Sequence, residues 1–138
     1  MCLASRASVR CLGRLGSRQC ASDIAGKAAL GQIKSSGADG LVSVGGGSTV
    51  GLGKALAIRT GLPHLGVPTT YAGSEMTPIL GETRDGRKTT MRDDRIFPQT
   101  VLYDVDFTLT LPKMMSVVSG MNAMANAVEA LYARTGTR

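Results

Sequence analysis

The sequence predicts an α/β fold in which a partial parallel sheet and a β-hairpin are followed by helices. Three observations predict this class. Residues 41–67 read as strand, glycine turn, helix and strand, which is the order of a βαβ crossover between parallel strands. Two short strand-like runs then flank Asp85-Gly86, a dipeptide typical of hairpin turns. Finally, residues 112–134 have the composition of helices.

The composition is that of one globular domain. A chain of 138 residues, 43% hydrophobic and 19% charged, can bury a single core, and no apolar run reaches the roughly 18 residues of a membrane span. The net charge of +6 is concentrated in residues 1–20, which contain four arginines and no acid. The remaining chain has twelve basic and ten acidic residues and no basic, aromatic-rich stripe. We therefore expect neither nucleic-acid nor membrane partners.

Residues 1–20 form an atypical basic leader that we expect to lie outside the fold. All three cysteines, Cys2, Cys11 and Cys20, fall in it, and their spacing matches no zinc motif. Its Arg- and Ser-rich composition fits either a mitochondrial transit peptide or a segment foreign to the fold. We favour the second, because the leader connects to nothing that follows. The rest of the chain has no targeting signal, which predicts a cytoplasmic location.

The central elements follow from local signals. Apolar positions at helical spacing predict a helix over residues 22–35. Ser48 is a good N-cap for a helix over 49–60, and Gly61 suits the left-handed position after it. The flanking strands are expected at 41–44 and 64–67, with Pro68 ending the second. In chain order, the next expected elements are hairpin strands at 76–83 and 87–91, a polar connection at 92–98 and a strand at 100–103.

The C-terminal helical segment raises two questions. We expect Ser119-Gly120 to break it into a short helix and a longer one that starts near Met121. Asn122 and Asn126 then lie one turn apart on one face of an otherwise apolar helix. Read from periodicity alone, they are more simply a pair of hydrogen-bonded core asparagines than functional groups.

Two loops are candidate binding segments. Gly45, Gly46, Gly47 and Ser48 follow a strand and open a helix, where backbone N–H groups and the helix dipole can hold a phosphate. The segment matches neither the GxGxxG nor the GxxxxGK[ST] motif, so a glycine turn without a ligand stays an alternative. The second loop, PTTYAGSE at 68–75, also follows a strand. In open α/β sheets both loops would face one crevice, although a plain polar loop is the alternative.

The remaining charged residues are weaker candidates. The arginines at 84–95 are more simply a solvated hairpin face. Lys88 is the cation among them that we expect to reach a phosphate or ribose. His64 is the only histidine, and inside an apolar strand it is more simply a core residue than a catalyst.

Five segments resemble a known family. They are GGGST at 45–49, PTTYAGSEMTP at 68–78, GRKTT at 86–90, YDVDFTLTLP at 103–112 and SGMNAMANAVEALYA at 119–133. Together they resemble the iron-containing alcohol dehydrogenase superfamily, and specifically its maleylacetate reductase branch. The resemblance covers about residues 37–133.

The resemblance implies a fold and a reaction. It implies that residues 21–111 are a partial Rossmann-like dinucleotide-binding domain and that residues 112–138 start a truncated all-helical domain. Members of the branch reduce the carbon–carbon double bond of maleylacetate, a dicarboxylate, to 3-oxoadipate with NADH or NADPH, in the degradation of aromatic and chloroaromatic compounds. Full-length relatives are expected to be homodimers. Since much of both domains is missing, we expect this chain to be a truncated, inactive fragment.

The resemblance also assigns roles by position. Gly45, Gly46, Gly47 and Ser48 would hold the pyrophosphate, and Thr69, Thr70 and Ser74 would line the nicotinamide and its ribose, with Lys88 nearby. No catalytic residue can be assigned. Metal-dependent relatives carry Asp and His where this chain has Asn122 and Asn126, so we expect no metal. The branch generally keeps the His, and the sequence does not explain Asn126.

Three alternatives remain open. The first is a metal-dependent alcohol dehydrogenase of the same superfamily, against which Asn122 and Asn126 argue. The second is a non-catalytic dinucleotide-binding half-domain. The third is a structural fragment with neither activity.

Overall fold

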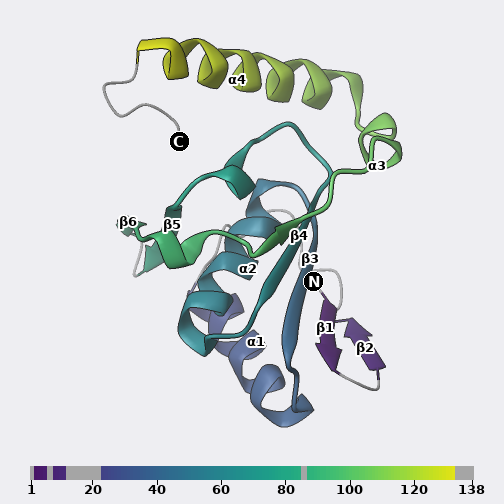
Figure 1. Ribbon diagram of the computed structural model, residues 1–138, viewed down its shortest axis with the longest axis vertical. Helices are drawn as coiled ribbons and strands as arrows, with labels where there is room; N and C mark the ends of the chain where they lie inside the picture. The colour runs from purple at the N-terminus through teal and green to yellow at the C-terminus, as the bar shows by residue number, and fades with distance from the viewer. Residues whose placement is uncertain (1, 6–7, 12–22, 85–86, 133–138) are drawn as a thin grey trace.

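The main sheet has five strands in the order β2-β1-β3-β4-β7. The computed structural model describes residues 2–5, 8–11, 23–84 and 87–132. The parallel part of the sheet consists of β3 (Gly40–Gly45), β4 (His64–Pro68) and β7 (Thr100–Val101). Figure 1 shows these strands at the centre of the molecule. The predicted α/β class is confirmed.

Two strands from the leader extend the sheet beside β3. β1 (Cys2–Ser5) pairs antiparallel with β3, and β2 (Ser8–Cys11) pairs antiparallel with β1. This differs from the expectation that residues 1–20 lie outside the fold. The physical reason is that the edge of β3 opposite β4 presents unpaired backbone N–H and C=O groups, which a short segment of almost any composition can satisfy.

A βαβ unit joins β3 to β4 through α2 (Gly47–Thr60). The helix ends as expected at Gly61, whose φ of 71° is left-handed and whose N–H donates to the Ala57 carbonyl at 2.8 Å. Its start differs from the expectation. Gly46 is the N-cap, with no side-chain cap, because the glycine turn already directs the chain into the helix and places Ser48 inside the first turn.

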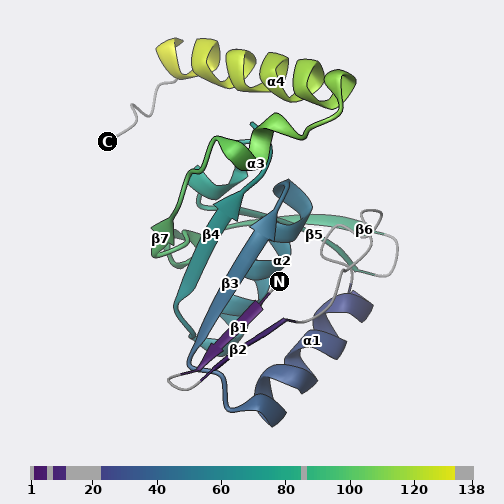
Figure 2. The same cartoon turned by 90° about the vertical axis from the view of Figure 1, so that its right-hand side faces the viewer.

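One hydrophobic core lies between the sheet and its helices. α1 (Asp23–Ser36), close to the predicted range, packs against α2. Ile33 of α1, Leu56 of α2 and Leu41 of β3 belong to one buried hydrophobic cluster. Figure 2 shows α2 behind β3 and β4, with no helix in front of these strands. The burial of β3 alternates accordingly, since Leu41 and Ser43 are buried whereas Val44 is 41% exposed.

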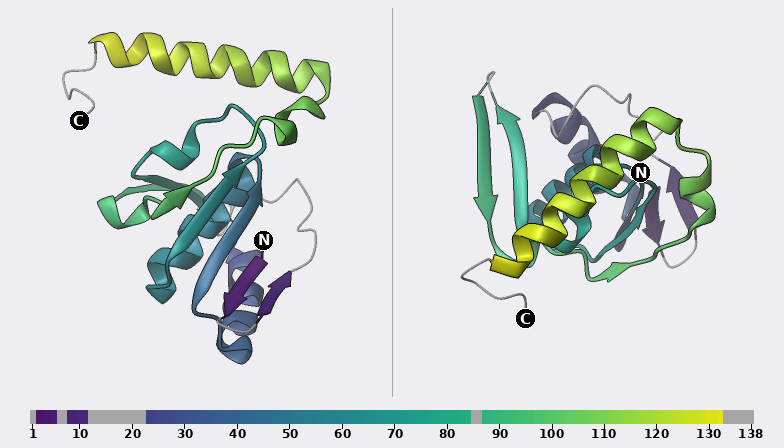
Figure 3. Two further views of the ribbon diagram at one scale, coloured as in Figure 1. Left: turned by 45° about the vertical axis from the view of Figure 1, so that its right-hand side comes forward. Right: turned by 90° about the horizontal axis from the view of Figure 1, so that it is seen from above.

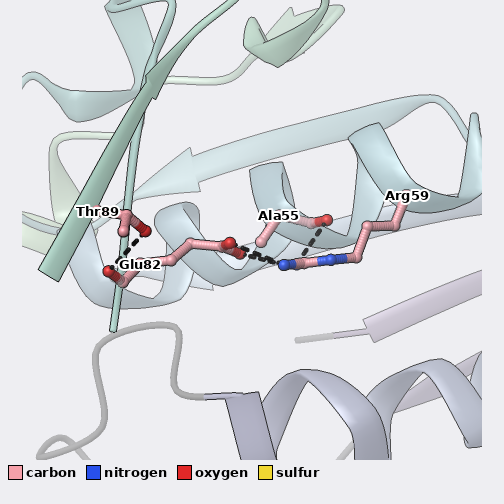
Figure 4. Close-up of polar contacts among 4 residues, drawn as sticks. All are labelled: Ala55, Arg59, Glu82 and Thr89. Atoms are coloured by element: carbon pink, nitrogen blue, oxygen red, sulfur yellow. Dashed lines mark hydrogen bonds and ion pairs between the residues drawn. The ribbon is translucent and has the colours of Figure 1, made fainter. Parts of the chain in front are cut away.

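The hairpin consists of β5 (Ile79–Arg84) and β6 (Arg87–Arg92), which confirms the predicted pairing. β5 begins later than expected because Ser74–Met76 form the 3-10 helix η1. The predicted turn residues Asp85 and Gly86 lie outside the described residues. Arg59 of α2 anchors the hairpin: its Nη2 donates to both carboxylate oxygens of Glu82 at 2.6 and 2.8 Å (Figure 4).

The expected polar connection at 92–98 contains the 3-10 helix η2 (Asp94–Ile96). Its Ile96 is buried with Ala55 and Leu80 in a second small cluster, which connects α2 to the hairpin. The strand expected at 100–103 is only two residues long, because pairing with β4 stops at Gly66.

The C-terminal segment forms α3 (Asp106–Leu109) and α4 (Lys113–Tyr132). The predicted break at Ser119-Gly120 is wrong. A helix-interior glycine costs only about 1 kcal/mol relative to alanine, and good helix formers on both sides offset that cost. Figure 2 shows α4 lying across the carboxyl ends of β3 and β4. Across the ranges that the structure describes, no helix combines the length and apolar character needed to cross a membrane.

Candidate functional site

The two candidate loops meet at the carboxyl end of the sheet. The register of β3 and β4 places Gly45 beside Pro68, and the Thr69 N–H donates to the Gly45 carbonyl at 3.0 Å. The loop after β4 therefore starts against the glycine turn. Seen from above in Figure 3, α4 crosses over this end of the sheet.

Glycines allow this close approach. Gly45 has a φ of 153°, and a Cβ there would lie 2.6 Å from Thr49 Oγ1. A Cβ on Gly46 would lie 3.1 Å from Thr70 Cγ2, and one on Gly47 would lie 3.3 Å from the Cβ of Ala72. Only glycine permits the first conformation without strain, and the other two positions have almost no space for a side chain.

A pocket of about 970 Å³ lies where the loops face the C-terminal helices. The start of α2 forms one wall, the loop after β4 a second, and the segment from α3 into α4 the third. The third wall is mainly apolar, whereas the first two present backbone amides and hydroxyl groups. The lining residues are Gly46, Gly47, Ser48, Thr49, Thr69, Thr70, Ala72, Phe107, Thr110, Leu111, Pro112, Met114, Met115, Val118, Ser119 and Asn122.

The α2 wall is suited to an anion. The carbonyl of Gly46 accepts the N–H groups of Thr49 and Val50 at 2.9 and 3.1 Å. The first N–H groups of a helix, here those of Gly47 and Ser48, have no acceptor within the helix. Both residues line the pocket, so these donors and the positive end of the helix dipole face it.

The structure brings most, but not all, of the predicted site residues together. Among the eight, it places five in the pocket lining, namely Gly46, Gly47, Ser48, Thr69 and Thr70. Gly45 lies directly behind them, and Ser74 Oγ would be 3.4 Å from a Cβ on Gly47. That hydroxyl is buried and has no hydrogen-bond partner among the residues described.

Lys88 lies apart from the pocket. It is exposed on β6, opposite Thr83 of β5, and is absent from the pocket lining. Its expected place near the nicotinamide ribose stays a prediction. The hairpin packs beside α2 rather than over its N-terminus, which the sequence could not indicate because the packing depends on Ala55, Leu80 and Ile96.

The face of α4 that carries both asparagines turns toward the loop after β4. Asn122 lines the pocket, and its Nδ2 lies 3.5 Å from the Ala72 carbonyl, at the limit of a hydrogen bond. Asn126 Nδ2 would lie 3.9 Å from a Cβ on Gly73. They are not core residues, since both are exposed. The interpretation as buried core asparagines is therefore wrong for this structure.

Lys54 is a buried cation that sequence reasoning missed. Only 1% of the residue is exposed, and its ammonium donates to three carbonyl oxygens: those of Ser74, Thr77 at 2.7 Å and Ile79 at 3.1 Å. Burial lowers the pKa of Lys54 to about 8, and the nearby Glu75 carboxylate opposes that shift. A lone charge within the run GLGKALAI was the signal that could have identified it.

Glu75 of η1 is buried as well, with 4% exposed. Tyr103 donates a hydrogen bond from its hydroxyl to Glu75 Oε1 at 2.9 Å. Burial and this hydrogen bond to the carboxylate raise the pKa of Tyr103 to about 12. The bond ties the loop after β4 to the chain that leads into α3.

His64 is a core residue, as predicted. It is 1% exposed, and its Nε2 lies 2.7 Å from Ser43 Oγ. Burial, with a smaller contribution from the positive charge of Lys54, lowers the pKa of His64 to about 4. The imidazole is therefore neutral at pH 7 and does not line the pocket.

The comparisons with known proteins agree on one family. A model of the family described as iron-containing alcohol dehydrogenase matches residues 16–105. The chain is 58% identical over 108 residues to the maleylacetate reductase of Rhizobium sp. (strain MTP-10005), covering 78% of this chain and 31% of the relative. It is 61% identical over 100 residues to that of Burkholderia cepacia, covering 72% and 28%. The chain thus spans about 30% of the length of these curated relatives.

Solved structures show the same likeness. The crystal structure of maleylacetate reductase from Agrobacterium tumefaciens aligns with a TM-score of 0.82 and 53% identity, covering 86% of this chain and 34% of that one. The sulfoacetaldehyde reductase of Bifidobacterium kashiwanohense, solved in complex with NAD+, aligns with a TM-score of 0.73 and 25% identity, covering 82% and 36%.

Proposed function

Because the chain belongs to the iron-containing alcohol dehydrogenase family, we propose that it carries the dinucleotide-binding part of a maleylacetate reductase. In this proposal, residues 21–111 are a partial dinucleotide-binding domain and residues 112–138 begin a helical domain. The whole enzyme reduces the carbon–carbon double bond of maleylacetate to 3-oxoadipate. The observation that carries the proposal is the glycine-lined start of α2 facing the pocket.

The pyrophosphate of NADH or NADPH would bind at the start of α2. Gly46 and Gly47 leave room for its oxygens to approach the backbone, and the N–H groups of Gly47 and Ser48 would donate to them. A similar protein was solved with NAD+ bound, at 25% identity, which supports a dinucleotide as the ligand.

The nicotinamide end would lie between Thr69, Thr70 and the apolar third wall. Bound NADH or NADPH supplies a hydride to the electron-poor double bond of the dicarboxylate substrate. The threonine hydroxyls and the buried Ser74 hydroxyl would orient the ribose and carboxamide by hydrogen bonds, while Met115 and Val118 would exclude water from that end. We assign none of the described residues that line the pocket as the donor of the proton that the reduction requires.

The family is named for iron, so it does not support the expectation that no metal is required. The side chains that this chain places at the corresponding helix face are the amides of Asn122 and Asn126, which are weak ligands for iron. Within the described ranges no group of three or more His, Cys, Asp or Glu side chains is placed to hold a metal ion. These residues do not fit an iron site, and we derive no step through a metal.

Calorimetric titration tests dinucleotide binding: NADH and NADPH are each titrated into the purified chain. Gly46→Val places a side chain against Thr70 and over the backbone N–H groups, and should abolish binding. Gly51→Ala is the matched control: it lies in the same helix with nothing within 4 Å of its Cβ, so binding should persist. A folded chain that binds neither cofactor would contradict the proposal.

An assay of maleylacetate turnover is the second test. Because the chain spans about 30% of its relatives, we expect the 138 residues alone to bind a dinucleotide without turning over maleylacetate. Loss of NADH absorbance on adding maleylacetate would overturn that expectation. Binding without turnover is also what a non-catalytic half-domain predicts, so the reductase assignment needs a full-length protein of this sequence.

A further inference from the structure

A buried cation links α2 to the segment 74–79 that follows the threonine loop. Lys54 projects from α2 and contacts η1 and the start of β5, 20 to 25 residues further along the chain. Besides the three carbonyls, its Nζ lies 3.3 Å from the Thr77 hydroxyl. One side chain therefore donates to three of the six backbone carbonyls of the segment 74–79.

A second contact links η1 to the chain that leads into α3. Glu75, buried within η1, accepts the hydroxyl of Tyr103, and Tyr103 precedes α3, whose Phe107 lines the pocket. Lys54 is on the helix whose N-terminus forms the first wall. Thus the cluster of Lys54, Glu75 and Tyr103 contacts the elements that carry all three walls.

We propose that the cluster of Lys54, Glu75 and Tyr103 is a positioning device that sets the spacing of the three pocket walls. Its importance for binding rests on the proposed dinucleotide function. The three side chains touch no ligand in this assignment. They act through the loop at 69–79 and through the chain that enters α3.

The choice of a lysine supports a positioning role over simple packing. Placing an ammonium in the interior is unfavourable unless it is hydrogen-bonded, and here the ammonium meets three carbonyl oxygens and a nearby carboxylate. An apolar side chain of similar length would fill the space but remove the ammonium from all three carbonyls, and the Ser74 carbonyl would keep only its hydrogen bonds from Thr77. The lysine thus determines where the segment 74–79 lies, in addition to filling volume.

The first test is hydrogen–deuterium exchange of the full chain. Lys54→Met keeps the length of the side chain and removes the ammonium, and it should raise the exchange rate of residues 73–79 by roughly tenfold. Lys34→Met, the same change at an exposed position near the end of α1, is the control and should leave this segment unchanged. Equal protection of 73–79 in wild type and Lys54→Met would overturn the proposal.

The second test is a pH profile that simple packing would not produce. The pKa of Lys54 is about 8 when the loop is closed and returns toward 10.5 when opening hydrates it. The open loop therefore binds more protons, and raising the pH from about 8 to about 9.5, below the ordinary Tyr103 pKa of 10.0, favours the closed loop. Protection of 73–79, corrected for intrinsic exchange, should rise in wild type and stay flat in Lys54→Met.

Other titrating groups do not mimic this profile. The groups that face Lys54 are Glu75 from η1 and His64 from β4, and His64 has a pKa of about 4. Tyr103, bonded to Glu75, has a pKa of about 12. Arg59, further along α2, is paired with Glu82. Identical profiles for wild type and Lys54→Met would contradict the proposal.

A third variant keeps the test decisive if Lys54→Met fails to fold. Tyr103→Phe removes only a hydroxyl from a residue that is 63% exposed, and Tyr132→Phe, at 71% exposed, is its control. Tyr103→Phe should speed exchange at 73–79 by roughly threefold, whereas Tyr132→Phe should not. No change in Tyr103→Phe would overturn the part assigned to Glu75 and Tyr103.

NADH titrations of the same variants separate the two proposals. Weaker NADH binding in Lys54→Met, by roughly tenfold, together with a loosened loop supports both. A wild type that binds no NADH, while Lys54→Met still loosens the loop, overturns the dinucleotide function and supports the positioning cluster. A wild type that binds NADH, with 73–79 unaltered in Lys54→Met, overturns only the cluster.

Discussion

Ser43 Oγ and His64 Nε2 lie 2.7 Å apart inside the sheet, where two neighbouring parallel strands face α2. Both residues are essentially inaccessible to solvent. The backbone of Gly53 lies directly above them, because a Cβ on that glycine would be 2.4 Å from His64 Nε2. This contact, and not a catalytic role, explains a histidine within an apolar strand.

The first prediction concerns acid stability. The pKa of His64 is about 4 in the fold and 6.5 when exposed, so the unfolded chain binds more protons between these values. Its contribution to the free energy of unfolding is fully present above pH 6.5 and is lost as the pH falls toward 4. Urea unfolding from pH 7 to 4 should show this slope in wild type, and a shallower slope in His64→Gln. Equal slopes would contradict the prediction.

The second prediction compares two glycines of one helix. Gly53→Ala should destabilise the fold by about 1–3 kcal/mol, because its methyl group would overlap His64 and Ser43. Gly51→Ala meets nothing within 4 Å and should stabilise α2 by up to about 1 kcal/mol. Thermal unfolding of both variants measures the difference. A Gly53→Ala protein as stable as wild type would show that this contact is not as close as described.

The third prediction concerns the attachment of the hairpin. Glu82→Gln weakens the Arg59–Glu82 ion pair, whose side chains are 28% and 12% exposed, and should lower the free energy of unfolding by about 0.5–1 kcal/mol. The loss should shrink at high salt, because screening weakens the wild-type pair. Glu129→Gln on the exposed surface of α4 is the control. A similar loss of unfolding free energy in that variant would show that the change in net charge, and not the ion pair, causes the effect.

The fourth prediction concerns the two asparagines of α4. Replacing Asn122 by Asp and Asn126 by His places a carboxylate and an imidazole one turn apart, where they can share one divalent cation. The double variant should bind Zn²⁺ at least about tenfold more tightly than wild type, as measured by competition with a chelating dye. Unchanged affinity would show that this face of α4 cannot form even part of a metal site.

Sequence reasoning succeeded where the signal is local. The βαβ unit, the end of α2 at Gly61 and the hairpin pairing all depend on residues within a few positions of each other. It also placed the glycine turn and the threonine loop at one edge of the sheet, since parallel strands align their carboxyl ends. The hydrogen bond from the Thr69 N–H to the Gly45 carbonyl shows that the two loops do lie side by side.

It failed where two signals compete or where distant segments decide. Ser119-Gly120 does not interrupt α4, because one glycine is a small cost against twenty helical residues. The leader strands pair with β3 because an open sheet edge accepts them. The exposed position of Lys88 likewise depends on distant packing, of Ile96 and Leu80 against α2, and its role toward the ribose stays a prediction.

The sequence by itself determined the fold class, the family and the loops that form the candidate site, because periodicity, turn residues and motifs are written in neighbouring positions. Only the tertiary structure decided that Lys54 is a buried cation bonded to the segment 74–79. Its partners lie 20 to 25 residues away, and its burial and lowered pKa arise only when α2, η1 and β5 come together. Contacts between distant segments, and the loss of water that they cause, cannot be read from local pattern.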